Sequence, residues 1–276
     1  MAEKQVNNEY DRKWKELTLS DNFIFQKFML NPDNCKKVLS EILGIEVVNV
    51  EYPEYEKVMD IRRDSKSIRL DVYVKGDETI YNVEMQCSDN EHIPKRSRYY
   101  QDLIDLDLLE KGTYYSELNR SFVIFICTFD YYGKERYKYT FTNKCEEVEG
   151  LEFGDETTKI IVNTKGTVGE ASRDFKDFIN AVNGEFDNTG YSATIKSEVE
   201  KIKSNDKWRR EYMTLYLHEQ EIMRKSREEG KAEGRTEGIA EATRLAIQNM
   251  LKKLSPDEII EMGYDRELVM SIAEEN

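Results

Sequence analysis

Two runs of alternating apolar and polar residues give the clearest pattern in the chain. They cover residues 69–74 and 80–86, and a short polar segment, residues 75–79, separates them. Alternation of this kind, interrupted by a few polar residues that include glycine, predicts a β-hairpin.

The predicted hairpin brings particular polar residues together. A turn centred on residues 77 and 78 places Asp71 opposite Glu84 and Arg69 opposite Gln86, all on the polar face. Two opposed carboxylates, with Cβ atoms roughly 5 Å apart, destabilise a strand pair unless a cation lies between them. The hairpin is therefore a candidate metal site.

Periodicity and capping residues predict the other elements before residue 165. Ser20 or Asp21 is suited to cap a short helix that carries Phe23, Phe25 and Phe28. The continuous apolar run at residues 122–129 predicts a strand that is buried on both faces. We also expect helices at 31–43, ending at Gly44, and from Pro94 to Gly112, with strands at 46–52, 68–74, 80–86, 136–142 and 159–163.

The last third of the chain is hydrophilic and has helical periodicity, at 170–182 and 194–227. Glycine then recurs at every fourth position, at Gly230, Gly234 and Gly238, which places all three on roughly one helix face. Such a face would allow close approach of a second helix, as in a dimer; the alternative is a low-complexity connector. Ser255 and Pro256 begin a small terminal helical hairpin, for which we expect a protein-contact or dimerisation role.

The residue types of the hairpin favour a hard cation. Mg²⁺ takes one or two carboxylates, here Asp71 and Glu84, with water and phosphate oxygens completing its shell. The carbonyl of Met85 is a further candidate ligand, and Gln86 is suited to orient a water molecule. The alternative is an exposed strand face that carries two solvated acids.

Composition limits the other classes of function. The chain has 276 residues, of which 35% are charged, and no apolar run approaches the ~20 residues of a membrane span. The first ten residues lack the apolar stretch of a signal peptide, so we expect a cytoplasmic protein with reduced cysteines. The four cysteines have no zinc-like spacing, only two histidines are present, and no phosphate-binding loop motif occurs.

The net charge of −14 opposes binding of nucleic acid at long range. Basic residues nevertheless flank the hairpin, where backbone phosphates would lie. They are Arg62, Arg63, Lys66 and Arg69 before its first strand, and Lys95, Arg96 and Arg98 after its second. Screening beyond a Debye length of ~8 Å limits the effect of distant acids, so a local DNA-binding surface remains compatible with the overall charge.

At these residues the chain resembles the PD-(D/E)XK nuclease superfamily, and most closely its recombination-promoting nuclease (Rpn) family. The superfamily pattern of one acid, then an acid-any-Lys triplet, reads here as Asp71 followed by Glu84-Met85-Gln86. Gln86 departs from the superfamily's Lys, a replacement familiar in this family. Further similarity lies at residues 20–28, 66–74, 96–100 and 122–126.

The resemblance implies an α/β fold: a restriction-endonuclease-like mixed sheet flanked by helices, with an α-β-β-β-α-β core and a helical C-terminal extension. It covers roughly residues 17–165, which we expect to form the nuclease-like domain. Residues 166–227 would then be a helical extension, and residues 228–276 an oligomerisation or partner-binding region.

The resemblance also implies a DNA endonuclease dependent on Mg²⁺ or Mn²⁺, with a role in recombination, mobile DNA or defence. Asp71, Glu84 and Met85 would hold the metal, Gln86 would position water or phosphate, and Asp21 or Glu41 would supply an additional acid. Contacts with DNA are expected from Arg69, Lys95, Arg96, Arg98 and Tyr99. Tyr100 would either contact phosphate, hold Gln86 in place, or belong to the core.

A second interpretation belongs to a different class. The same scaffold would serve as a DNA- or protein-binding module with weak or no catalysis, which the acidic charge and the Gln in place of Lys both favour. For the nuclease we expect DNA as a partner, a homo-oligomer formed through the C-terminal helices, and no membrane association.

Overall fold

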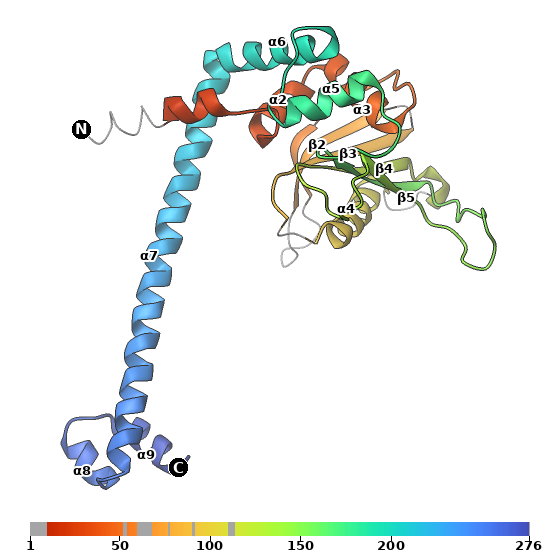
Figure 1. Cartoon of the computed structure of the whole chain (residues 1–276). Helices are drawn as coiled ribbons and strands as arrows, with labels where there is room; N and C mark the ends of the chain where they lie inside the picture. Colours follow the sequence, from red (N-terminus) through yellow and green to blue (C-terminus); the bar gives the residue numbers. More distant parts are fainter. Residues whose placement is uncertain are drawn as a thin grey trace. The chain divides into compact units, whose positions relative to one another are not determined.

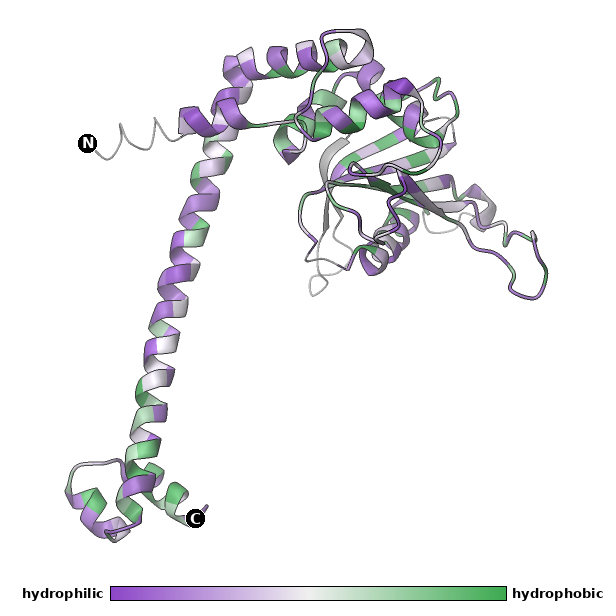
Figure 2. Cartoon of the chain, viewed as in Figure 1, coloured by the Kyte–Doolittle hydropathy of each residue, from purple (hydrophilic) through white to green (hydrophobic). Residues whose placement is uncertain are grey.

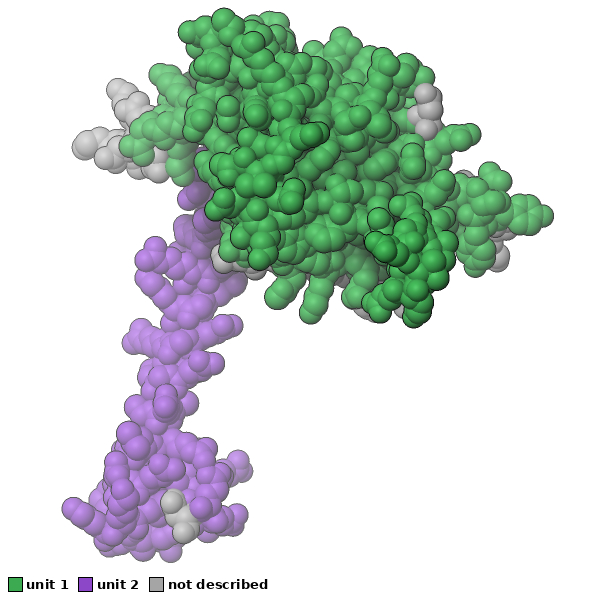
Figure 3. Space-filling model, turned by 45° about the vertical axis from the view of Figure 1, so that its right-hand side comes forward, with its two compact units in different colours: residues 1–210 green, residues 211–276 purple. Residues whose placement is uncertain are grey.

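The computed structural model describes residues 10–51, 54–59, 68–76, 78–89, 92–109 and 114–275, with the backbone alone for 54–59 and 68–70. The chain divides into two compact units, Met1–Arg210 and Glu211–Asn276 (Figure 3). The boundary expected at residue 165 falls inside the first unit, because two helices that follow it pack against helices near the N-terminus.

A six-stranded mixed sheet forms the centre of the first unit, in the order β1-β2-β3-β4-β6-β5. β1, β2 and β3 pair antiparallel, β3, β4 and β6 pair parallel, and β5 pairs antiparallel with β6. The strands are β1 (Glu54–Met59), β2 (Ile68–Gly76), β3 (Thr79–Gln86), β4 (Arg120–Cys127), β5 (Lys138–Phe141) and β6 (Thr157–Asn163). β4 lies inside the sheet and is buried on both faces beyond its first residue, as its continuous apolar run predicts.

Helices cover both faces of the sheet (Figure 1). α4 (Ile93–Leu108) lies on one face; α2 (Asn22–Met29), α3 (Pro32–Leu43) and α5 (Arg173–Val182) lie on the other. α6 (Gly190–Ser204) packs on α2 and α5. This arrangement confirms the predicted mixed α/β fold and its order of one helical region, three strands, a helix and a strand.

Local sequence explains where several helices begin and end. Asp21 caps α2 by accepting hydrogen bonds from the backbone N–H groups of Phe23 and Ile24, and Asn31 caps α3 by accepting from Asp33. Gly44 ends α3 with φ of 72°, a left-handed conformation that glycine adopts without steric cost. These boundaries confirm the predicted ones.

The first unit departs from the expectations at three points. No strand forms at residues 46–51; the strand that pairs with β2 on the side away from β3 is β1, which the alternation did not single out. Residues 10–16, for which no element was predicted, are helical and bury Tyr10 and Trp14. α4 ends at Leu108, and Gly112, its expected end, lies outside the described residues.

Hydrophobic residues concentrate in the sheet and in the helices against it, whereas the middle of the long helix α7 (Asp206–Leu251) is hydrophilic (Figure 2). Under α4, the buried cluster includes Tyr73, Tyr100, Ile104, Val123 and Phe125. Among the described residues, no helix combines the length and the apolar character needed to cross a membrane.

The second unit is helical. α7 (Asp206–Leu251) begins in the first unit, has 46 residues and buries only Ile247 among those described. Its C-terminal end packs with α8 (Pro256–Glu261) and α9 (Arg266–Glu274) around a small core of Ile247, Ile259, Val269 and Ile272. Ser255 and Glu258 form a capping box at α8, which confirms the predicted terminal hairpin.

Gly166 allows a close backbone contact beside the sheet. A Cβ at this position would lie 2.6 Å from Cα of Tyr137 and 2.7 Å from the carbonyl oxygen of Arg136. Gly166→Ala is therefore expected to lower the free energy of unfolding by about 1–3 kcal/mol, the usual range for overpacking. Urea unfolding measures this change. Gly263→Ser is the control, because Gly263 has a left-handed backbone and an added Cβ would meet nothing within 4 Å. If both variants lose the same free energy of unfolding, the packing explanation for Gly166 is contradicted.

Candidate active site

The hairpin of β2 and β3 has the predicted register. Val72 pairs with Val83, Tyr73 with Asn82, and Gly76 with Thr79. Glu78, in the two-residue turn, has φ of 49°, the left-handed conformation that such turns require. The register brings Asp71 to the position opposite Glu84.

Asp71 and Glu84 lie where the described pairing of the two strands ends. The backbone N–H of Asp71 donates to Oε1 of Glu84 at 3.2 Å, and the backbone N–H of Met85 donates to Oδ2 of Asp71 at 3.0 Å. Each carboxylate thus accepts a hydrogen bond from the opposing strand. This reciprocal arrangement fixes both acids at the end of the ladder.

The two acids are not on an exposed face. Glu84 is 3% exposed and Asp71 is half-buried, because α4 covers this side of the sheet. Burial, followed by the negative charge of Asp71, raises the pKa of Glu84 from 4.5 to about 8. The alternative of two solvated acids is therefore wrong for Glu84.

Gln86 is held on both sides of its carboxamide. Nε2 donates to the carbonyl oxygen of Ser88 at 2.7 Å, and Oε1 accepts from Nη1 of Arg96 at 2.8 Å. The amide orientation is assigned from this network, in which each atom has a matching partner. Gln86 consequently positions the Arg96 side chain.

Arg96 and Tyr100 project from the first turns of α4 toward these residues. Nη2 of Arg96 donates to the hydroxyl of Tyr100 at 2.9 Å and lies 3.8 Å from Oε2 of Glu84. The guanidinium also lies over the Phe125 ring, 5.3 Å from its centroid. Since Arg96 and Tyr100 are four residues apart, they share the helix face that meets the sheet.

The sequence model of the PD-(D/E)XK nuclease family transposases matches residues 23–229, which is 207 of the 276 residues. The chain belongs to this family. No curated protein and no solved structure matches it. The match spans the whole sheet and continues through α5 and α6 into α7, and it includes Asp71, Glu84, Gln86 and Arg96.

Membership of the PD-(D/E)XK nuclease family identifies the scaffold as that of a nuclease, and nucleases of this kind generally use divalent metals. The chain's own residues fit such an ion. Asp71 and Glu84 provide two carboxylates, within the one or two that Mg²⁺ commonly takes. The backbone N–H of Met85 points toward Asp71 on β2. In an extended strand the carbonyl of the same residue points to the same side, so the Met85 carbonyl also faces β2. Among the described residues, no group of three or more His, Cys, Asp or Glu side chains is arranged so that it could hold a metal ion.

The residues predicted to contact DNA divide into three groups. Lys95 and Arg98 are exposed on α4, so both are accessible to a phosphate backbone. Tyr99 is half-buried and packs against the core, and Arg96 points into the site instead of outward. The side chain of Arg69, with Arg62, Arg63 and Lys66, lies outside the described residues.

Asp21, one of the two additional acids expected, caps α2, and its charge also acts on the thiol of Cys87. Burial raises the pKa of the Cys87 thiol, and the charges of Asp21 and Asp71 raise it further. The Cys87 thiol donates to the carbonyl oxygen of Ser20 at 3.1 Å. The charges of Asp21 and Asp71 thus both influence this thiol.

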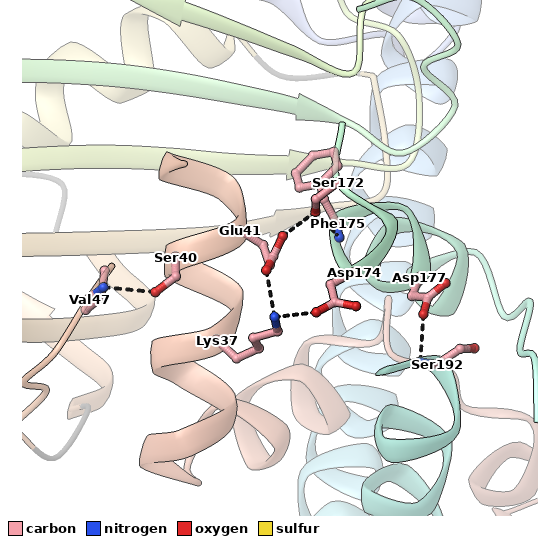
Figure 4. A network of polar contacts seen from close by, with 9 residues as sticks. All are labelled: Lys37, Ser40, Glu41, Val47, Ser172, Asp174, Phe175, Asp177 and Ser192. Atoms are coloured by element: carbon pink, nitrogen blue, oxygen red, sulfur yellow. Dashed lines mark hydrogen bonds and ion pairs between the residues drawn. The ribbon is translucent and has the colours of Figure 1, made fainter. Parts of the chain in front are cut away.

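Glu41, the other expected acid, belongs to a different cluster (Figure 4). It accepts hydrogen bonds from Lys37, at 2.7 Å, and from Ser172, and Lys37 also pairs with Asp174. These contacts join α3 to the start of α5, beside a cavity of about 660 Å³. Among the described contacts, none joins Glu41 to Asp71 or Glu84.

Sequence analysis missed Ser88 and the inward direction of Arg96. Ser88 acts through its backbone carbonyl, so its side chain gives no signal. Arg96 had a usable signal: it precedes Tyr100 by four residues, and Tyr100 shares its face with the buried Ile93 and Ile104. Tyr100 is both a core residue and the anchor of Arg96.

Proposed function

We propose that the chain is a DNA endonuclease that hydrolyses phosphodiester bonds with Mg²⁺ or Mn²⁺, in recombination, mobile DNA or defence. The observation that carries the proposal is the acid pair itself. Asp71 and Glu84 are fixed beside each other, and Glu84 is almost completely buried although the charged form of a buried acid is unfavourable. A divalent cation would relieve both the repulsion and the burial of charge.

The proposed roles follow the geometry. Asp71, Glu84 and the carbonyl of Met85 would hold the ion, and Asp21 remains the candidate for an additional acid. Bound there, the ion would polarise the phosphodiester and lower the pKa of a water nucleophile. Lys95 and Arg98 would seat the DNA backbone from the exposed side of α4, and Gln86 would orient the groups around the scissile phosphate.

Nicking of supercoiled plasmid tests the proposal. Purified protein with Mg²⁺ or Mn²⁺ at low salt should convert the supercoiled form to the open circular form, and chelation of the metal should stop the reaction. Absence of nicking with both metals would contradict the nuclease assignment.

The second candidate, a binding module with weak catalysis, is favoured by the net charge of −14 and by the neutral Gln86. Calorimetric titration of Mn²⁺ separates the two. A catalytic centre should bind the ion in the wild type and lose it in Asp71→Ala, whereas a pure binding module requires no such dependence.

We also propose that the chain forms a homo-oligomer through residues 228–276. α7 has exposed apolar side chains, among them Met223, Ile239 and Leu245, and a Cβ added at any of its three spaced glycines would meet nothing within 4 Å. Each exposed helical glycine costs about 1 kcal/mol relative to alanine. Close approach of a second copy at the glycine face would offset this cost.

The glycine face gives a direct test of the oligomer. Replacing Gly230, Gly234 and Gly238 together with alanine is expected to raise helicity yet shift the assembly toward monomer by at least tenfold in dissociation constant. Analytical ultracentrifugation measures the shift. A variant that gains thermal stability and keeps the wild-type mass would instead support a connector helix.

A further inference from the structure

Among the described contacts of the acid pair, the positive charge beside Glu84 comes from Arg96 on α4 and not from the triplet. Hydrolysis of a phosphodiester adds negative charge to the phosphate oxygens as the nucleophile attacks, and preorganised positive groups stabilise that charge. Gln86, where the superfamily has lysine, is neutral and has its carboxamide engaged on both sides. We infer that Arg96, from α4, supplies this charge at the scissile phosphate. The inference rests on the proposed nuclease function.

The contacts of Arg96 hold its charge toward the site. Nη1 donates to Gln86 at 2.8 Å, and Nε and Nη2 donate to the hydroxyl of Tyr100 at 3.3 and 2.9 Å. Gln86 and Tyr100 are neutral, so these two hydrogen bonds orient the guanidinium without adding a negative charge against it. A planar guanidinium that is held in a fixed orientation suits the bidentate recognition of phosphate.

The environment of Arg96 strengthens the electrostatic interactions of its guanidinium. Its side chain is 26% exposed and lies over the rings of Phe125 and Tyr100, where the low dielectric weakens screening by solvent. The ion pair with Glu84 has a separation of 3.8 Å, longer than a charge-assisted hydrogen bond. If the guanidinium served only to neutralise Glu84, we would expect a direct charge-assisted hydrogen bond between the two side chains. Instead its Nη2 stands 3.8 Å from Oε2 of Glu84, one of the proposed metal ligands, without a direct hydrogen bond between the two.

The position of Arg96 also explains the glutamine. Lysine at residue 86 would place a second cation against the guanidinium, within the 2.8 Å that now separates Oε1 of Gln86 from Nη1 of Arg96. A neutral acceptor at residue 86 therefore suits a cation supplied from the helix, because it accepts a hydrogen bond from Arg96 where lysine would repel it. The same reasoning assigns Gln86 and Tyr100 as positioning residues that act through Arg96.

Steady-state nicking by Arg96→Gln, Arg96→Lys and Arg98→Gln tests the inference at saturating Mn²⁺. Arg96→Gln should lower kcat by about 10²–10³-fold, the range for loss of one preorganised donor to a developing oxyanion. Arg96→Lys should retain more activity than Arg96→Gln, because it keeps the charge without the fork. Arg98→Gln removes the same charge two residues away on the exposed face of α4, so it should raise KM and leave kcat close to the wild-type value.

Chemical rescue separates a reacting charge from a structural one. Millimolar ethylguanidinium should restore part of the kcat of Arg96→Ala but none of the kcat of Asp71→Asn, whereas a misfolded variant would not respond. If Arg96→Gln keeps kcat within about threefold of wild type while Asp71→Asn is inactive, the role of Arg96 is overturned and the nuclease stands. If Arg96→Gln raises KM alone, Arg96 belongs to ground-state DNA binding and the inference also fails. If the wild type itself cleaves no DNA, the proposed function fails first and the inference with it.

Discussion

Asp71→Asn and Glu84→Gln should each lower metal-dependent DNA cleavage by at least about 100-fold, since loss of a mere outer-shell partner already costs about 10–100-fold. Both substitutions keep the shape of the side chain and remove its negative charge. The carboxamide oxygen can still accept the cross-strand N–H that links each acid to the opposing strand. The fold should therefore persist while the metal is lost.

Plasmid nicking at matched protein concentrations measures this effect, and circular dichroism verifies the fold. Glu41→Gln is the matched control, because Glu41 is an acid of the same unit whose described partners are Lys37 and Ser172. It should lower stability through the loss of its ion pair yet keep the cleavage rate of the folded protein. Full activity in both site variants would refute the assignment of Asp71 and Glu84, and an inactive but folded Glu41→Gln protein would move the site toward α3.

The second prediction concerns stability and pH in the absence of metal. The pKa of Glu84 is about 8 in the folded chain and about 4.5 when the acid is free in solution. Between these values the folded protein holds a proton that the unfolded protein has released, so the contribution of Glu84 to stability is fully present below about pH 4.5 and is lost as pH rises toward 8. One such proton gives a slope of about 1.4 kcal/mol per pH unit.

Glu84→Gln removes this titration and should flatten the profile over the same range. Urea unfolding in the presence of a chelator, at pH 5 and at pH 8, measures the difference. At pH 8 the variant should have the higher free energy of unfolding, and the difference between the two proteins should be smaller at pH 5. Added Mn²⁺ should stabilise the wild type more at pH 8 than at pH 5, because the bound ion requires the deprotonated acid. Parallel pH profiles for the two proteins would show that Glu84 titrates normally.

Features that depend on residues close together in the chain could be predicted from the sequence, whereas features that depend on distant segments could not. The hairpin register followed from strict alternation and a two-residue turn, both of which act within a few residues. The caps at Asp21, Asn31 and Ser255 were predictable for the same reason, since a capping side chain bonds to backbone only two or three residues away.

The elements that were not predicted are those whose secondary structure depends on contacts with distant segments of the chain. β1 was missed because Glu54–Met59 becomes a strand by pairing with β2, and its sequence carries no strong apolar alternation. The helix at residues 10–16 was missed because its polar sequence gives no sign that Trp14 donates a hydrogen bond to the carbonyl oxygen of Lys203. In both cases the partner that stabilises the element is absent from the local sequence.

By itself, the sequence determined which residues meet across the hairpin, where most helices begin, and that β4 is a central strand. Those features depend on periods and hydrogen bonds that span a few residues. Only the tertiary structure decided that α4 closes over the acid pair, that Glu84 is thereby buried with a raised pKa, and that Arg96 turns inward to Gln86. Burial and the direction of a long side chain depend on what packs against them, and here that partner comes from another element of the fold.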